Sequence, residues 1–169
     1  MSVGGSPSDP RGDPATTVEI RCVLFFGEYE HTIDAKGRLA IPAEAREAIE
    51  REKVGPALVL APGPNGSLWL WPEKTFATIA KSFGGSILPD AHVAKFERQL
   101  FSQTARVELD SAGRIRVPER HRQKYGLQSQ VVVIGVGQHM ELMDAEAWRQ
   151  QSEADATSAM DIWEQARVH

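Results

Sequence analysis

Two short stretches of similar sequence each carry two basic residues, IDAKGRLAIP from residue 33 and LDSAGRIRVP from residue 109. The first contains Lys36 and Arg38, and the second contains Arg114 and Arg116. The forked guanidinium of arginine can bind the O6 and N7 atoms of guanine together, whereas lysine offers a point charge that suits phosphate. These four side chains are therefore candidate DNA contacts, with Lys36 suited to the DNA backbone and Arg38 suited to bases.

The residues around these side chains predict a tight turn between two strands. Asp34 and Asp110 can hydrogen-bond the backbone of their own turns, and Gly37 and Gly113 supply a positive φ at little steric cost. A plainer interpretation is that Arg38 only forms an ion pair with Asp34, which is worth little at a surface. Both interpretations place a two-stranded ribbon here, and such a ribbon fits the major groove of DNA.

The turn belongs to a longer internal repeat. Asp34 matches Asp110 at an offset of 76 residues, whereas LWLWPEKTF matches MELMDAEAW at an offset of 72. We expect the difference of four residues to fall in the loop APGPNGS, because loops tolerate changes in length. Each unit of strand, turn, strand, helix, hairpin and helix is small for a stable core. The two units are therefore expected to pack on each other as a pseudo-dimer within one chain.

Periodicity and breaker residues predict the remaining elements. Residues 1–17 are rich in Gly, Pro, Ser and Asp, which predicts a flexible extension. In the first unit we expect a strand alternating from residue 28, a strand from Arg38, a helix over 42–53, a hairpin over 57–72, helices over 72–83 and 91–102, and a linker at 84–90. In the second unit we expect a strand over 104–110, a turn and strand over 111–118, a helix over 119–126, a strand, turn and strand over 130–144, and a helical, acidic end over 145–169.

Further basic residues allow two interpretations. The segment 98–124 contains seven Lys and Arg residues against three acidic ones, so it is either an ordinary solvated face or an electrostatic footprint for phosphates. Arg46 and Arg122 recur at equivalent helix positions. This repetition favours a structural role, in which each arginine ties its helix to the turn, over contact with DNA.

Several other residues favour structural roles. His31 lies on the apolar face of its strand, where its counterpart is Val107, so we expect a histidine in the core. The single cysteine, Cys22, excludes an internal disulfide and is expected to be a buried thiol. The four tryptophans are expected in the core or at subunit contacts rather than stacked on bases; they are Trp69, Trp71, Trp148 and Trp163.

The composition and the missing motifs exclude several classes of protein. The net charge of −4 over 169 residues means that any contact with nucleic acid must depend on a local face. The sequence has no run of about 18 apolar residues and no apolar leader segment, so we expect a soluble, intracellular protein. It also has no zinc spacing, no phosphate-binding loop and no nucleophile motif. We therefore expect no metal, no cofactor and no small-molecule substrate, and we do not expect an enzyme.

The duplicated Asp-x-x-Gly-Arg turn, with a proline four residues after each arginine, resembles the MraZ family of bacterial regulators of the division and cell-wall gene cluster. The resemblance runs from about residue 26 to residue 148, and each half is similar to a SpoVT-AbrB, or swapped-hairpin, domain. It implies an α+β fold of two tandem AbrB-like β-barrel repeats, packed as an intramolecular pseudo-dimer with helices on the outside. It also implies that the turns over 34–38 and 110–114 face DNA.

This resemblance divides the chain into five parts. They are a flexible extension over 1–24, a first repeat over 25–84, a connecting segment and helix over 85–102, a second repeat over 103–148, and a polar helix or tail over 149–169. The sequence departs from the family in its long segment before Phe25, in Ala45, where the family has a bulky apolar residue, and in its acidic C-terminal end.

The resemblance implies a sequence-specific DNA-binding transcriptional regulator. It would repress the division and cell-wall cluster, including its own promoter, by binding short direct repeats as a ring-shaped oligomer in the cytoplasm, at the nucleoid. An alternative is an antitoxin-like swapped-hairpin protein that binds a protein toxin and its own operator. The tandem fusion of two units favours the regulator, and the neighbouring genes separate the two functions.

Overall fold

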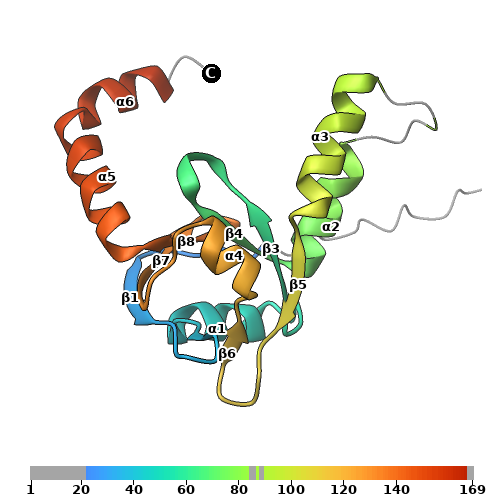
Figure 1. The fold of residues 1–169 in the computed structure, drawn as a ribbon, viewed down its shortest axis with the longest axis horizontal. Helices are drawn as coiled ribbons and strands as arrows, with labels where there is room; N and C mark the ends of the chain where they lie inside the picture. Colours follow the sequence, from blue (N-terminus) through green and yellow to red (C-terminus); the bar gives the residue numbers. More distant parts are fainter. Residues whose placement is uncertain (1–21, 84–86, 88–89, 167–169) are drawn as a thin grey trace, which may run out of the picture.

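The computed structural model describes residues 22–83, 87 and 90–166 (Figure 1). The predicted extension over 1–17 and most of the predicted linker at 84–90 lie outside these residues. The elements are β1 (Glu28–Thr32), β2 (Arg38–Ala40), α1 (Ala43–Arg51), β3 (Ala57–Pro62), the 3₁₀ turn η1 (Pro64–Gly66), β4 (Leu68–Pro72), α2 (Glu73–Ser82), α3 (Ala91–Ser102), β5 (Ala105–Glu108), β6 (Arg114–Arg116), α4 (Glu119–Lys124), β7 (Gln130–Val136), β8 (His139–Asp144), α5 (Ala145–Thr157) and α6 (Ala159–Ala166). The predicted α+β class is confirmed, and the strands pair antiparallel.

The strands form two sheets that join the two repeats. One sheet has six strands in the order β1-β7-β8-β4-β3-β5, and the other consists of β2 and β6. Each repeat keeps its own hairpin, β3–β4 in the first repeat and β7–β8 in the second. The first strand of each repeat, however, pairs with the hairpin of the other repeat: β1 pairs with β7, and β5 pairs with β3. The two repeats are therefore linked by exchanged strands.

The strand pairs between the repeats have a local two-fold symmetry. β2 and β6 pair with Leu39 opposite Ile115, and these residues match each other at the offset of 76. β4 and β8 pair with Trp69 opposite Glu141, which match at the offset of 72. When equivalent residues face each other across an antiparallel pair, exchanging the two strands leaves the pairing unchanged. Each of these two pairs is therefore centred on a local pseudo-two-fold axis.

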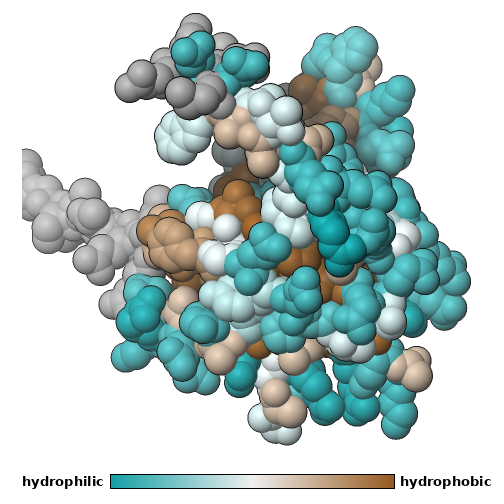
Figure 2. All heavy atoms as spheres, turned by 90° about the vertical axis from the view of Figure 1, so that its left-hand side faces the viewer, coloured by the Kyte–Doolittle hydropathy of each residue, from teal (hydrophilic) through white to brown (hydrophobic). Residues whose placement is uncertain are grey.

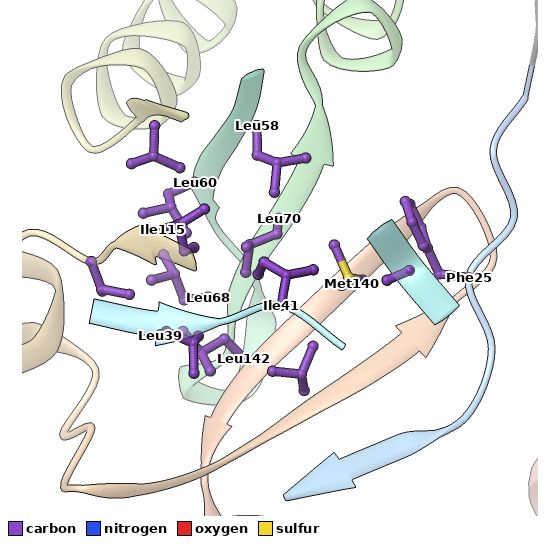
Figure 3. Close-up of a cluster of buried hydrophobic side chains, with 14 of the residues drawn as sticks. Phe25, Leu39, Ile41, Leu58, Leu60, Leu68, Leu70, Ile115, Met140 and Leu142 are labelled. Atoms are coloured by element: carbon purple, nitrogen blue, oxygen red, sulfur yellow. The ribbon is translucent and has the colours of Figure 1, made fainter. Parts of the chain in front are cut away.

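The hydrophobic core lies between the two sheets (Figure 3). On the side of β2 and β6, Leu39, Ile41 and Ile115 face the core, and each side chain is at most 1% exposed. The six-stranded sheet contributes Leu58, Leu60, Leu68, Leu70, Met140 and Leu142. Successive residues of a strand point to opposite faces. The inward faces of both sheets are therefore apolar. The residues that alternate with these core residues along each strand point away from the core.

The first repeat is four residues longer than the second, and these extra residues do not all lie in the predicted loop. β3 matches β7 at an offset of 73, because Leu58 lies opposite Val107 while Val131 lies opposite His31. α1 has nine residues and α4 has six, since α4 is stopped early by Gly126 at φ 60°. Three of the four extra residues therefore lengthen α1 at its C-terminal end, and only one lies in the hairpin loop. The prediction that all four lie in the loop was wrong.

Two helical pairs extend from the six-stranded sheet (Figure 1). α2 and α3 pack through edge-to-face contacts of Phe76 with Phe101 and of Phe83 with Phe96, with ring centroids 6.2 and 5.5 Å apart. α5 and α6 follow β8 in the same way that α2 and α3 follow β4. In the view of Figure 1 both pairs rise on one side of the sheet, and β2 and β6 lie on the other. The helical pairs are therefore separated from the two-stranded ribbon.

The predicted helical end over 145–169 is divided at Ser158 into α5 and α6. The hydroxyl groups of Thr157 and Ser158 donate to the carbonyl groups of Glu153 and Ala154, at 3.0 and 3.3 Å. Bonds of this kind, four residues back along a helix, compete with the helical backbone and often bend it. The predicted boundary between residues 148 and 149 lies inside α5.

The described chain begins with an extended segment that packs against the core on one side. Val23 and Phe25 are buried, whereas Cys22, Leu24 and Phe26 are exposed, so alternate side chains point inward. The prediction of a buried thiol at Cys22 was therefore wrong, because the residue falls on the outward side of this alternation. Val23 lies within the segment predicted as the extension, so the packed part of the chain begins before residue 25.

Figure 2 shows the face of the molecule that carries α5 and α6. Hydrophilic residues cover most of this face, and hydrophobic residues gather near its middle, below the helices. Among the described helices, none combines the length and the apolar character that a membrane crossing requires.

Candidate nucleic-acid interface

The turn after β1 is built around the carboxylate of Asp34. Its Oδ1 accepts hydrogen bonds from the backbone N–H groups of Lys36 and Arg38, both at 2.9 Å, and its Oδ2 accepts one from Nε of Arg38 at 2.6 Å. The N–H of Gly37 donates to the carbonyl oxygen of Asp34 at 2.9 Å. Gly37 has φ 78°, a left-handed conformation that favours glycine. One carboxylate thus holds both the turn and the arginine.

The turn after β5 repeats this network. Oδ1 of Asp110 accepts hydrogen bonds from the backbone N–H groups of Ala112 and Arg114, both at 2.9 Å, and Oδ2 accepts one from Nε of Arg114 at 3.0 Å. Gly113 has φ 72°, close to the value at its counterpart in the first turn. The one difference in charge between the turns is Ala112, which stands where the first turn has Lys36.

The hydrogen bonds in both turns stabilise ionised carboxylates. The pKa of Asp34 lies below its ordinary value, first because the backbone N–H of Arg38 donates to it and then because the Arg38 side chain does, while partial desolvation opposes the shift. The pKa of Asp110 is lowered for the same reasons by Arg114. A carboxylate with a depressed pKa contributes stability above its ordinary pKa, and this contribution is lost as the pH falls through the folded value. Both ion pairs are therefore intact at neutral pH.

β2 and β6 form a ribbon with one buried face and one outward face. Leu39 and Ile115 lie opposite each other and point into the core. The residues on either side of them point outward, because side chains alternate along a strand. This places the outward face of the ribbon on the side away from the six-stranded sheet (Figure 1).

The outward face of the ribbon collects residues from both repeats. Arg38 lies opposite Arg116, and Ala40 lies opposite Arg114. Three of the four basic residues singled out in the sequence therefore share one surface. The fourth, Lys36, is exposed in the turn that leads into β2. The structure thus brings together all four residues, although the two strands come from different repeats.

Arg38 and Arg114 are held but not enclosed. Their side chains are 37% and 36% exposed, and each forms an ion pair with the aspartate of its own turn. Within the described residues the Nε atom of each guanidinium is bonded, whereas the terminal amino groups make no hydrogen bond. In each arginine, the aspartate therefore holds Nε in place, and the two terminal amino groups can donate hydrogen bonds to a ligand.

Arg46 and Arg122 hold the turns from the helix side. A Cβ atom added to Gly113 would lie 2.5 Å from Cδ of Arg46, and one added to Gly37 would lie 3.3 Å from Nε of Arg122. Nε of Arg46 also donates to the carbonyl oxygen of Ile41 at 3.1 Å. The predicted structural tie between helix and turn is confirmed. The sequence analysis did not predict, however, that each helix contacts the turn of the other repeat.

The basic segment 98–124 is divided among several surfaces. Arg106 on β5 forms ion pairs with Glu73 and Glu108, both at 2.6 Å, so its charge is locally balanced. Arg122 packs on a glycine, and Arg98 lies on α3 in a helical pair. Outside the ribbon, this distribution favours the interpretation as an ordinary solvated surface.

The aromatic residues of the six-stranded sheet lie on its outer face. Trp69 and Trp71 are half-buried there and enclose the ring of His139, with centroids 4.1 and 4.4 Å from it. His31 is half-buried rather than in the core, because β1 is an edge strand of the sheet. Among the described residues, no group of three or more His, Cys, Asp or Glu side chains converges as a metal site would require.

A second surface feature, between α5 and α6, was not singled out from the sequence. Trp148 on α5 and Trp163 on α6 line a groove of about 400 Å³, together with Ala156 and Ala159. We call it the α5–α6 groove. Trp163 is 72% exposed, so it is not part of the core. The available signal was the presence of two tryptophans in an otherwise acidic helical segment.

Comparison with known proteins gives one consistent result. A family model described as "MraZ protein, putative antitoxin-like" matches twice, over residues 24–91 and 100–167, which confirms the tandem repeat. The protein "Transcriptional regulator MraZ" of Lactiplantibacillus plantarum is 35% identical over 141 residues, which cover 83% of this chain and 96% of its own length. The proteins of the same name from Heliobacterium modesticaldum and Mycoplasmoides gallisepticum are 34% and 36% identical, covering 83% and 78% of this chain and 95% and 89% of their own lengths. The resemblance noted in the duplicated turns is therefore confirmed, and the chain belongs to the MraZ family.

Proposed function

We propose that this chain is a sequence-specific DNA-binding transcriptional regulator and that it contacts duplex DNA through the ribbon of β2 and β6. The observation that carries the proposal is the outward face of this ribbon, where Arg38, Arg114 and Arg116 stand over a fully buried inward face. A two-stranded β-ribbon fits the major groove, where bases can be distinguished by their donors and acceptors. The relatives named transcriptional regulators support the same function.

In this proposal Arg38 and Arg114 read bases, and Lys36 and Arg116 bind the backbone. Nε of each base-reading arginine is held by an aspartate, so fewer rotamers are accessible and less entropy is lost on binding. The terminal amino groups are then available to the O6 and N7 atoms of guanine. Contacts to phosphate fix the register of the protein on the duplex without reading its sequence.

We also infer that the two repeats form a closed pseudo-dimer of the swapped-hairpin type, with a β-barrel around the shared core. The exchange of β1 and β5 supports this inference. Two backbone hydrogen bonds also support it, because each links one repeat to the turn of the other. The N–H of Ile41 donates to the carbonyl oxygen of Gly113 at 3.0 Å, and the N–H of Val117 donates to that of Gly37 at 2.8 Å. The repeats would then span 25–84 and 103–148.

The protein is further proposed to act as a ring-shaped oligomer on short direct repeats of DNA. The α2–α3 pair carries four Lys and Arg residues against two Glu, and it leaves Phe96 and Phe101 50% and 44% exposed. The α5–α6 pair carries five Asp and Glu residues against one Arg, and it contains the groove lined by Trp148 and Trp163. Opposite charges and exposed apolar residues suit a head-to-tail contact, which produces a ring when the rotation closes. Several linked copies gain affinity on repeated sites through effective concentration.

The genes proposed as targets are the division and cell-wall cluster, including the regulator's own promoter. The regulator would act as a repressor in the cytoplasm, at the nucleoid. A reporter behind the promoter of that cluster should be expressed more strongly when the gene for this chain is deleted. Unchanged or lower expression in the deletion strain would contradict repression.

The central test uses Arg38→Ala and a duplex selected from random sequence by the wild-type protein. Losing a bidentate contact costs about 1–3 kcal/mol, so the affinity in a gel shift should fall roughly 5- to 150-fold per site. Circular dichroism should stay unchanged, because the side chain is half-exposed. Arg149→Ala, on α5, is the control for a lost positive charge away from the ribbon and should leave affinity unchanged. Wild-type affinity in Arg38→Ala would refute the proposed interface.

The oligomer is tested by light scattering. The wild-type protein should give a mass several times 18.6 kDa. Trp163→Ala should lower this mass, because the exposed indole lines the α5–α6 groove, whereas Val136→Ala at an exposed site on β7 serves as the control. A clean monomer at micromolar concentration, or equal affinity for one DNA repeat and for several, would contradict the oligomer.

A further inference from the structure

The ribbon of β2 and β6 is symmetric in its pairing but not in its charges. The internal repeat makes Arg38 equivalent to Arg114 and Ala40 equivalent to Arg116. Because the strands are antiparallel, Arg116 lies opposite Arg38, and Ala40 lies opposite Arg114. One end of the ribbon therefore carries two arginines side by side, and the other end carries one.

The turns add to the same imbalance. Lys36 lies in the turn that enters the ribbon at Arg38, whereas Ala112 occupies the equivalent place before Arg114. We call the end formed by Lys36, Arg38 and Arg116 the cationic end, and the end formed by Arg114 the single-arginine end. Sequence comparison of the repeats alone shows the two differences in residue type. Only the strand register shows that both extra charges fall at the same end.

The two residues that break the symmetry also have no acidic partner in the described part of the chain. Arg38 and Arg114 each form an ion pair with an aspartate. Lys36 and Arg116 are exposed, and among the described residues their side chains form neither an ion pair nor a hydrogen bond. Like charges directly opposite each other destabilise a strand pair. The arrangement of Arg116 opposite Arg38 is therefore unfavourable for folding alone and becomes favourable when an anion lies over it.

We propose that the cationic end makes the main contact with duplex DNA and thereby sets the direction in which the chain lies on it. The proposal rests on DNA binding by the ribbon and goes further, because it gives the two ends different roles. At the cationic end Arg38 reads a base, and Lys36 and Arg116 hold the phosphates beside it. The single-arginine end adds one base contact through Arg114. The DNA site read by one chain is consequently asymmetric, although the backbone of the ribbon has pseudo-two-fold symmetry.

The proposal makes a quantitative statement about salt. Each phosphate contact contributes about −0.9 to the slope of log K against log salt concentration. Lys36→Ala and Arg116→Ala should therefore each flatten the slope by about 0.9, whereas Arg149→Ala on α5 should leave it unchanged. If Arg116→Ala behaves like Arg149→Ala, the cationic end does not bind the backbone.

A mirrored variant tests the direction itself. It combines Lys36→Ala, Ala112→Lys, Ala40→Arg and Arg116→Ala, so that the two ends exchange their charges while composition and net charge stay the same. None of these four side chains is buried, so the fold should survive, which circular dichroism checks. On the selected duplex the mirrored protein should bind in the opposite orientation to the wild type. Its cationic end, now the end with Arg114, should occupy the place that the wild-type cationic end occupies on the DNA.

The direction is read with an iron–EDTA cleavage probe on a single cysteine in the full-length protein. Cys22→Ser removes the natural thiol, and Ala35→Cys or Ser111→Cys places the probe at equivalent exposed positions in the two turns. With wild-type ribbon residues the two probes should cut on opposite sides of the selected site, and in the mirrored variant the two patterns should exchange. Equal cutting on both sides by each probe, or patterns that do not exchange, would overturn the proposed direction.

The outcomes separate this proposal from the proposed function. If Arg38→Ala keeps full affinity, the ribbon is not the DNA-binding surface, and the proposed function fails. If Arg38→Ala loses affinity but the cleavage patterns do not exchange, the ribbon binds DNA without a preferred direction, and only this inference fails. If the mirrored variant does not fold, the salt slopes of Lys36→Ala and Arg116→Ala, compared with that of Arg149→Ala, decide the question.

Discussion

The contact between Arg46 and Gly113 allows a direct measurement of how the two repeats are joined. In Gly113→Ala the new Cβ would lie 2.5 Å from Cδ and 2.7 Å from Nη1 of Arg46, so the arginine must move. The backbone at this position has φ 72°, where an L-residue costs about 1–2 kcal/mol. Moving Arg46 also breaks its hydrogen bond to the carbonyl of Ile41, worth about 0.5–1.5 kcal/mol. We therefore expect Gly113→Ala to lower the free energy of unfolding by about 1.5–3.5 kcal/mol.

The chain offers a matched control for the backbone strain. Gly66 has φ 74°, and a Cβ added there meets nothing within 4 Å, so Gly66→Ala should cost only the strain of about 1–2 kcal/mol. In an Arg46→Ala background Gly113→Ala should cost no more than Gly66→Ala, because the obstructing side chain is gone. Urea unfolding measures these differences, since about 1 kcal/mol shifts the midpoint by roughly 0.3–1 M.

The four proteins of this double-mutant cycle isolate the coupling between the repeats. We expect a coupling of about 0.5–1.5 kcal/mol, which is typical of residues in direct contact. All unfolding curves need the same protein concentration, because assembly stabilises the folded state by mass action. The reasoning is refuted if Gly113→Ala costs the same in both backgrounds, since Arg46 of the first repeat would then not rest on the turn of the second.

Three further perturbations test other parts of the structure. Leu39→Ala removes a fully buried side chain from the centre of the ribbon and should cost about 2–5 kcal/mol in urea unfolding, so a loss below about 1 kcal/mol would contradict its place in the core. Asp34→Asn should lower the melting temperature at neutral pH, and because the folded pKa of Asp34 is depressed, the difference from wild type should shrink as the pH falls below the ordinary value of 3.8. A difference that stays constant down to strongly acidic pH would argue against the ion pair. Deleting residues 1–17 should leave both the melting temperature and the DNA affinity unchanged, because that composition does not support a packed core, and a large fall in either would contradict this.

Helices and strands whose limits depend on neighbouring residues in the sequence were predictable. The helix over 91–102 and the start of a strand at Arg38 occur where predicted, because each depends on periodicity and on neighbouring breaker residues. The break at Ser158 was missed, because the segment contains no Gly or Pro there and the bend arises from hydroxyl groups bonded to the helix backbone. The exposure of Cys22 was missed because the alternation of an isolated extended segment depends on what it packs against.

The pairing of strands between the repeats was not predictable in this way. Alternation shows which side chains of a strand share a face, but it does not identify the neighbouring strand. The location of Arg116 opposite Arg38, and of Arg46 on the turn at Gly113, depends on that neighbour. For the same reason the sequence identified the four candidate DNA contacts without showing that three of them share one end of a ribbon.

The exchanged architecture gives a fused pair of repeats a surface that two identical copies of one repeat could not form. A symmetric homodimer of a single unit could build the same ribbon, but both of its strands and both of its turns would carry the same residues. In this chain the two halves differ in charge at two places on the ribbon and its turns, with Arg116 against Ala40 and Lys36 against Ala112. Antiparallel pairing turns these two separate differences into one concentrated difference between the ends of the ribbon. Because each turn also packs against an arginine from the helix of the other repeat, the charge difference lies on a supported surface, which the proposed directional contact with DNA requires.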